Sequence, residues 1–229
     1  MKIQINDTKF FISIISTFSH QRTVTFSLKD KFTILSTNQI FLLEEKCYEI
    51  IEQGDDFTVC VASLLKNISL LYSYPLTLDV SDRLYLCTNT KYFSIGLNIN
   101  CIKYDNPCIN YINSELKFII SNVNLLKDFS GDTIYEIGNG KLTLKNVSNV
   151  QTDTIIIDLL NDNKFNHQIS YYEDEFTCSN YWVNNLKGIS SLINGIMICV
   201  SEFVVSIQVL FKKHEGSYLE LQTYKKVTI

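Results

Sequence analysis

The stretch from Ser179 to Ile193 has a clear two-sided pattern of apolar and polar positions. At the helical period of about 3.6 residues, its apolar side includes Trp182, Leu186 and Ile189. The opposite side holds small polar groups and one cation, namely Asn180, Asn184, Lys187 and Ser191. A solvated helix face normally mixes glutamate with lysine, so a face without any carboxylate is unusual.

Three further stretches repeat this design and predict helices. The first begins at the capping residue Asp7 and ends near Phe18, the second spans Ala62–Tyr72, and the third runs from a Ser114 cap to about Phe129. In each, apolar residues point to a core and a lysine lies among small polar groups on the other side. These polar sides carry Lys9 and Ser13 in the first helix, with His20 just past its end, Lys66 and Asn67 in the second, and Lys117, Ser121 and Asn124 in the third.

Runs of strand-like residues separate the four helices. In the first half, strands are predicted at Thr23–Leu28, Lys31–Ser36, Gln39–Glu44, Cys47–Ile51, Asp56–Val61, Leu76–Val80, Arg83–Thr88 and Tyr92–Ile99. In the second half, they are predicted at Thr133–Ile137, Lys141–Val147, Thr154–Leu160, Gln168–Tyr172, Ile196–Ser201, Val204–Phe211 and Ser217–Tyr224. This alternation of helices and strand runs predicts an α+β fold class.

The order strand, helix, strands, helix, strands occurs twice, which favours an internal duplication. The stretch TKFFISIIS at residues 8–16 resembles ELKFIISNV at residues 115–123. Residues 100–110 have no clean period and contain one of only two prolines. We therefore predict an N-terminal domain at residues 1–100, a connector at 101–110 and a C-terminal domain at 111–229.

Composition indicates a globular chain, because 46% of its 229 residues are hydrophobic and 19% are charged. The formal net charge of −4 argues against a generally basic nucleic-acid binder but leaves room for a local basic surface. Seven cysteines without a C-x-x-C pair indicate reduced, intracellular thiols. The sequence also has no apolar run long enough to span a membrane and no apolar core of a signal peptide, so no membrane contact is expected.

The sequence gives little support for catalysis. His20, His167 and His214 are scattered without cysteine or carboxylate at ligand spacing, so no metal site is expected. The glycines at 138 and 140 flank Asn139 and favour a hairpin turn over a phosphate loop. The acidic group at residues 173–175 is expected to be a solvated corner. We predict neither catalytic residues nor a cofactor.

The recurring lysines offer a different chemistry. Lys9, Lys66, Lys117 and Lys187 each project among serine and asparagine on an acid-free face. An ammonium group contacts a phosphate as a point charge without reading any base, which suits DNA held loosely and independently of its sequence. The alternative is that helices need polar faces and that lysine is common there.

Three stretches resemble the DNA sliding clamps of the proliferating cell nuclear antigen type, a family that includes phage, viral and checkpoint clamps. They are MKIQINDTKFFISIISTF at the start, residues 115–146 in the middle, and residues 181–227 near the end. The resemblance covers nearly the whole chain in its order of elements. It implies two tandem, similar clamp-type domains with helices on one face of antiparallel sheets, and three protomers that close a ring around duplex DNA.

The resemblance also implies roles for individual residues. DNA-facing residues would be Lys9, Ser13, His20, Lys66, Asn67, Lys117, Ser121, Asn124, Asn184 and Lys187. Partner-binding residues would be Ile40, Ile102, Tyr104, Pro107, Tyr224, Lys225 and Val227. The subunit interface would pair the strand holding Tyr92, Ile95 and Leu97 with the strand holding Ile155 and Ile157.

The function implied is a non-enzymatic processivity factor in DNA replication and repair, with a DNA polymerase and a clamp loader as partners. The alternatives are a subunit of a heterotrimeric checkpoint clamp, a viral late-transcription factor on the same fold, and an unrelated small α+β enzyme. An intracellular location is expected, in the nucleus of a eukaryote or the host cytoplasm for a virus or phage. The short connector is closer to phage and viral clamps, and the Asn- and Ile-rich composition suits an AT-rich genome.

Overall fold

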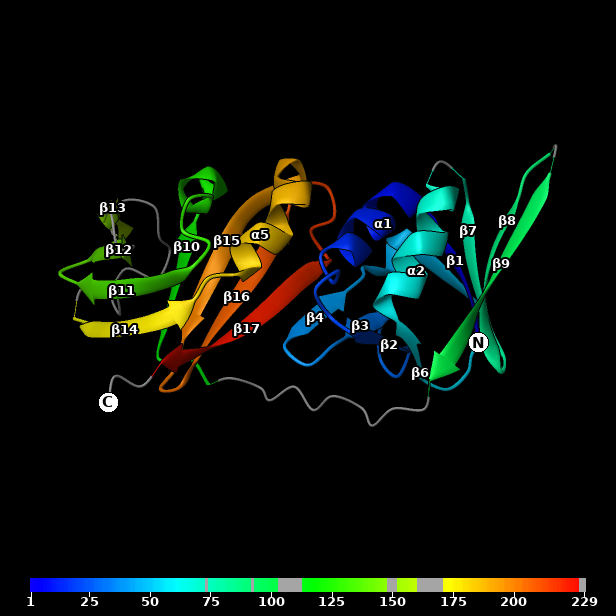
Figure 1. Ribbon diagram of the computed structural model, residues 1–229, viewed down its shortest axis with the longest axis horizontal. Coiled ribbons are helices and arrows are strands. Elements are labelled where there is room, and N and C mark those ends of the chain that lie inside the picture. Colours follow the sequence, from blue (N-terminus) through cyan, green and yellow to red (C-terminus); the bar gives the residue numbers. More distant parts are fainter. Residues whose placement is uncertain (73, 92, 103–112, 148–151, 160–170, 227–229) are drawn as a thin grey trace. The chain divides into compact units, whose positions relative to one another are not determined.

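The computed structural model describes residues 1–72, 74–91, 93–102, 113–147, 152–159 and 171–226 (Figure 1). The chain divides into two compact units. Unit 1 comprises Met1–Ile109 together with His214–Tyr218, and unit 2 comprises Asn110–Lys213 together with Leu219–Ile229. The short segment 214–218 therefore packs with unit 1, although the residues on both sides of it in sequence belong to unit 2.

Unit 1 contains one run of antiparallel strand pairs. In spatial order they are β5 (Tyr48–Glu52), β1 (Lys2–Ile5), β7 (Leu76–Val80), β8 (Arg83–Asn89), β9 (Ser94–Ile102), β6 (Phe57–Cys60), β2 (Thr23–Ser27), β3 (Thr33–Leu35) and β4 (Gln39–Leu42). Strand β9 pairs with β8 through residues 94–100, and with β6 only at Cys101 and Ile102. It thus extends two residues into the stretch that we expected to be a connector.

Two helices of unit 1 lie on the same side of these strands (Figure 1). Helix α1 (Thr8–Ser16) is capped by Asp7, whose Oδ1 accepts a hydrogen bond of 2.9 Å from the Phe10 amide. Helix α2 (Val61–Ile68) continues into the 3₁₀ turn η2 (Ser69–Leu71), and a further turn, η1 (Glu45–Cys47), precedes β5. Each helix buries one face, as the 3.6-residue pattern predicted for both.

The strands of unit 2 form two antiparallel groups. The first places β10 (Leu116–Ile120) beside β15 (Ile193–Val200), which pairs with β16 (Val204–Phe211). The second has the order β13 (Thr152–Asp158), β12 (Lys141–Val147), β11 (Asp132–Gly138), β14 (Asp174–Ser179) and β17 (Tyr218–Lys226). Its hairpin turn has positive φ angles of 52° at Asn139 and 72° at Gly140, which confirms the predicted Asn-Gly turn.

The helix predicted between Ser114 and Phe129 is wrong. Residues 116–120 form strand β10, and only Val123–Leu126 form a helical turn, η3. Burial alternates along β10, because Leu116, Phe118 and Ile120 are buried while Lys117 is exposed. The similar stretches at residues 8–16 and 115–123 therefore differ in structure, because the first forms a helix and the second mainly a strand.

Of the strand predicted at Gln168–Tyr172, only Tyr171 and Tyr172 are described, and these two residues are not in a strand. Residues 168–170 lie outside the described residues, and the strand here is β14, which begins at Asp174. The acidic group at residues 173–175 is not a separate solvated corner, because Asp174 and Glu175 belong to β14. The Asp174 carboxylate forms an ion pair of 2.6 Å with Lys225.

The helical pattern at residues 179–193 is confirmed as α5 (Trp182–Leu186) followed by the 3₁₀ helix η4 (Lys187–Leu192). Asn180, which is fully buried just before α5, fixes its start. Its side-chain oxygen accepts hydrogen bonds from the Tyr135 hydroxyl at 2.7 Å and from the Trp182 indole N–H at 3.1 Å. Burial raises the pKa of Tyr135 well above its usual value, so this hydroxyl remains a donor.

The described cysteines are free thiols, with Cys47, Cys178 and Cys199 buried. Cys108 lies outside the described residues. No described helix is long and apolar enough to cross a membrane.

Replacing Asn180 with leucine should destabilise the protein by about 2–4 kcal/mol, because the Tyr135 hydroxyl, the Trp182 indole and the Cys178 thiol lose their acceptor. Tyr135→Phe should cost only about 1 kcal/mol, since the indole keeps its bond. Urea unfolding followed by circular dichroism measures both values. Asn184→Ala, at an exposed position of α5, is the control and should change stability by about 0.5 kcal/mol or less; equal losses in all three variants would contradict this account.

Candidate nucleic-acid interface

The exposed sides of α1 and α2 carry the polar residues expected there. Lys9 and Lys66 are both exposed, and the Lys9 ammonium lies 6.0 Å from the centre of the Tyr72 ring. The Ser13 hydroxyl donates to the Lys9 carbonyl at 2.8 Å, and the Asn67 amide donates to the Ser63 carbonyl at 2.7 Å. These short groups are satisfied within their own helices, which leaves the two lysines as the long charged side chains of this surface.

His20 lies just beyond the end of α1. His20 is exposed as a residue, but the protein partly desolvates its imidazole, and this desolvation lowers the pKa of His20 below the usual value. At neutral pH the ring is therefore uncharged. His20 contributes a neutral polar group to this surface and no positive charge.

In unit 2 the corresponding polar residues lie on η3, α5 and η4. Asn124, Asn184 and Lys187 are exposed, as is Lys127 at the end of η3. A cavity of about 240 Å³ lies between the helical segments, lined by Val123, Asn124, Leu126, Lys127, Trp182, Val183, Leu186, Lys187 and Ser190. Lys127 and Lys187 both line this cavity and therefore lie in one small region of unit 2.

The prediction that Lys117 lies on a helix face is wrong. Lys117 belongs to β10 and projects from the side of the strand opposite the buried row of Leu116, Phe118 and Ile120. Ser121 is an exposed residue directly after this strand. The cation on the helical turn is Lys127, which the sequence reasoning missed; the capping residue Asn122, whose side chain accepts from the Asn124 amide, marks the true start of the turn.

The helical lysines differ from many others in their electrostatic surroundings. The segments α1, α2, η2, η3, α5 and η4 contain no aspartate or glutamate. Within the described ranges, no carboxylate forms an ion pair with Lys9, Lys66, Lys127 or Lys187. Several other lysines are paired, as in Lys2–Asp79, Lys29–Asp56, Lys46–Glu44, Lys145–Glu136, Lys225–Asp174 and Lys226–Asp132. These helical lysines thus have no ion-pair partner among the described carboxylates, and the nearest acid in sequence is the exposed Asp128 directly after Lys127.

The residues expected to bind partner proteins are only partly described. Ile40 and Ile102 end one row of cross-strand neighbours that also contains Leu35, Thr25 and Thr58. With strands spaced about 4.8 Å apart, four spacings separate the two isoleucines by roughly 19 Å, so they do not touch.

The remaining partner-binding expectations concern the C-terminal strand and the connector. Tyr224 is 69% exposed, whereas the Lys225 ammonium is paired with Asp174 and lies 4.4 Å from the centre of the Phe176 ring. Lys225 is thus already used within unit 2. Tyr104, Pro107 and Val227 lie outside the described residues.

The expected interface strands each have an unpaired side within their own unit. Among described residues of unit 1, positions 94–100 of β9 pair only with β8. In unit 2, β13 pairs only with β12 in the described ranges. Ile95 is exposed and Leu97, Ile155 and Ile157 are half-buried, while Tyr92 lies outside the described residues. Both strands present backbone groups that another chain can pair with.

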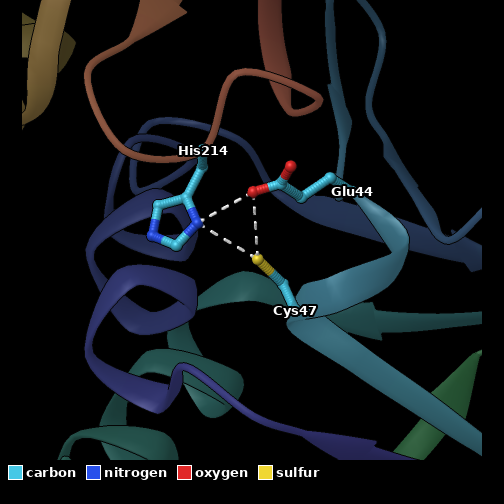
Figure 2. Close-up of side chains that lie close together, drawn as sticks. All are labelled: Glu44, Cys47 and His214. Carbon is cyan, nitrogen blue, oxygen red and sulfur yellow. Dashed lines mark hydrogen bonds and ion pairs between the residues drawn. The ribbon is translucent and has the colours of Figure 1, made fainter.

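The structure also gathers three residues that the sequence analysis treated as scattered. Glu44, Cys47 and His214 converge in unit 1, with Cys47 Sγ 3.2 Å from His214 Nδ1 (Figure 2). The sequence reasoning, which judged the histidines by their spacing along the chain, missed this grouping. His167 lies outside the described residues.

Known structures share this fold. No family model matches the chain, and no curated protein matches its sequence. The PCNA2–PCNA3 complex of Sulfolobus tokodaii matches with a TM-score of 0.75 and 13% identity over 99% of both chains. The proliferating cellular nuclear antigen of Entamoeba histolytica gives 0.76 and 13% over 99% of this chain and 98% of that one. PCNA of Thermococcus kodakaraensis gives 0.75 and 12% over 98% and 99%. The expected likeness to sliding clamps is thereby confirmed at the level of fold.

If the helical lysines contact phosphates, Lys127→Gln should lower the slope of log affinity for duplex DNA against log salt by about 1. Fluorescence anisotropy with a labelled duplex at low ionic strength measures this slope. Lys117→Gln removes the same charge from the strand side of unit 2 and should leave the slope unchanged. A larger effect from Lys117 than from Lys127 would contradict the assignment.

Proposed function

We propose that this protein is a sliding clamp that encircles duplex DNA without sequence specificity and acts as a processivity factor for a DNA polymerase. The observation that carries the proposal is the set of helical lysines without an ion-pair partner among the described carboxylates, on a fold shared with solved clamp structures. A clamp has no reaction to catalyse. Its task is to remain on DNA while a polymerase moves, and the protein's contribution is topological.

The charge distribution suits this task. A few separated lysines neutralise few phosphates, so their binding to DNA is weak and falls steeply with salt. Ammonium groups contact phosphates as point charges and carry no information about the bases. Weak contacts of this kind let a ring slide, whereas a dense basic surface would hold it in place.

A partner surface completes the proposal. In it, the polymerase contacts the residues that the resemblance assigns to partner binding, namely Ile40, Ile102, Tyr104, Pro107, Tyr224, Lys225 and Val227. The exposed aromatic ring of Tyr224 supports this assignment, because large apolar groups on a surface are typical anchors for partner proteins.

Reversing the charge of three helical lysines should abolish polymerase stimulation on long primed templates. The variant is Lys66→Glu, Lys127→Glu and Lys187→Glu, and the assay uses the replicative DNA polymerase of the same organism. Three carboxylates on the helical faces would repel the phosphates of the enclosed duplex.

The matched control reverses three exposed lysines outside those helices, Lys31, Lys117 and Lys141. It carries the same net charge and should retain stimulation. Unchanged stimulation by the helical variant, with its fold verified by circular dichroism, would refute the assignment of the DNA-facing surface.

We further propose that the ring contains three copies of this chain, joined by pairing β9 of one copy with β13 of the next. Among the described residues, each of these strands has one side without a strand partner in its own unit, and pairing the two would satisfy those backbone groups. Light scattering at micromolar concentration should then give a mass three times the 26.4 kDa of the chain.

Aspartate at Ile155 and Ile157 should convert the trimer to monomer, because it places charge on the half-buried side of β13. Aspartate at Ile156, which is 64% exposed on the other side, is the control and should leave the mass unchanged. A monomer for the unmodified chain would contradict self-association and favour a heteromeric checkpoint or transcription clamp. One comparison structure, from Sulfolobus tokodaii, is a complex of two differently named chains, PCNA2 and PCNA3.

A further inference from the structure

Glu44, Cys47 and His214 form a compact cluster of three different metal-binding groups in unit 1 (Figure 2). Cys47 Sγ lies 3.2 Å from His214 Nδ1 and 3.6 Å from Glu44 Oε1, and Nδ1 lies 3.1 Å from Oε1. The side chains are well covered, since Glu44 is 11% exposed, His214 15% and Cys47 3%. Three ligand atoms of three chemical types thus face one point.

These separations match those of a tetrahedral zinc site. With Zn–S of about 2.3 Å and Zn–N or Zn–O of about 2.0–2.2 Å, tetrahedral angles place ligand atoms roughly 3.3–3.6 Å apart. Each of the three measured separations lies within about 0.4 Å of the corresponding tetrahedral value. An ion would therefore need only small side-chain movements.

The imidazole of His214 is held in the orientation that a ligand needs. Its far nitrogen, Nε2, lies 3.3 Å from Asp7 Oδ2, and its ring stacks on Phe10 with the ring centres 3.9 Å apart. Without metal, Nδ1 donates to the Glu44 carboxylate; with a metal bound, a proton on Nε2 beside Asp7 would leave a lone pair on Nδ1 for the ion. A carboxylate behind a histidine is the usual outer-sphere arrangement at metal sites, and it is a second observation independent of the three ligands.

We infer that Glu44, Cys47 and His214 bind one zinc ion, with a fourth position left for water. Binding releases the thiol proton of Cys47 to solvent and replaces the hydrogen bonds within the cluster. The ion would hold segment 214–218 in unit 1, adding to two bonds already present. The Gly216 amide donates to Glu44 Oε2 at 3.2 Å, and the Glu44 amide donates to the Ser217 hydroxyl at 2.9 Å.

One neighbouring group opposes the ion. The Lys46 ammonium lies 3.0 Å from Glu44 Oε1 and competes with a cation for the same oxygen. Lys46 is largely exposed, with 63% of its side chain accessible, so it can turn into solvent when metal binds. The site should therefore bind zinc more tightly when this positive charge is removed.

The test is titration of the full chain, stripped of metal with a chelator, with Co²⁺ as a spectroscopic probe. One equivalent should produce a thiolate-to-cobalt charge-transfer band and tetrahedral d–d bands, and excess Zn²⁺ should abolish both. Zinc should also raise the midpoint of thermal unfolding. A chain that binds no cobalt at micromolar concentration would overturn the inference.

Variants locate the site. Cys47→Ser should remove the charge-transfer band, while Cys60→Ser, at a partly exposed cysteine outside the cluster, should keep it. His214→Ala should abolish tight binding, while His20→Ala should not. Retention of the full signal by Cys47→Ser would show that the metal binds elsewhere and overturn the inference. Circular dichroism verifies the fold of each variant.

Two charge variants separate a metal site from a hydrogen-bonded cluster that only supports structure. Asp7→Asn keeps a good helix cap but removes the carboxylate behind His214, and should weaken cobalt affinity about 10–100-fold. Lys46→Gln should strengthen it. If neither change alters cobalt affinity, the proposed coordination is wrong even where cobalt binds.

Discussion

Burial of short helical segments against a sheet is the constraint on which the rest of this structure depends. Helices of five to nine residues are too short to be stable alone, and their apolar faces need a sheet to cover them. That requirement fixes which side of each helix faces water. In both units the outward side holds lysine with serine or asparagine and no acid, so the packing that stabilises the fold also presents the positive charge. Folding and the outward display of these lysines therefore share one cause.

Sequence patterns predicted those helices and strands in which buried apolar residues recur at only one spacing, either helical or strand-like. Helices α1 and α2, the α5–η4 segment and most strands were found, because their apolar residues recur at clear helical or strand spacing. The stretch LKFII failed, since a short apolar run suits both periods. Residues 116–120 form a strand because they pair with β15. That partner lies far along the chain, so a local pattern could not reveal the pairing. The error placed Lys117 on a helical surface, whereas the lysine beside the helical turn is Lys127.

The convergence around His214 was not predictable in the same way. Glu44 and His214 are 170 positions apart, and only the return of residues 214–218 to unit 1 brings them together. Composition and local periodicity contain no information about such a return. The partner-binding residues show a related limit. The resemblance assigned Ile40 and Ile102 to one surface, whereas the strand register places them at opposite ends of one row of cross-strand neighbours.

The charges near the ends of β13 affect how a newly synthesised chain associates with other copies before it is assembled. Asp153 and Asp158 bracket the apolar run in this edge strand. Charged side chains on an edge strand work against its pairing with a further copy of the same edge. Strand β9, from Ser94 to Ile102, carries no charged residue and imposes no such penalty. In a chain that has not yet assembled, the charges on β13 thus work against pairing of one β13 with another. They do not work against pairing of β13 with the uncharged strand β9.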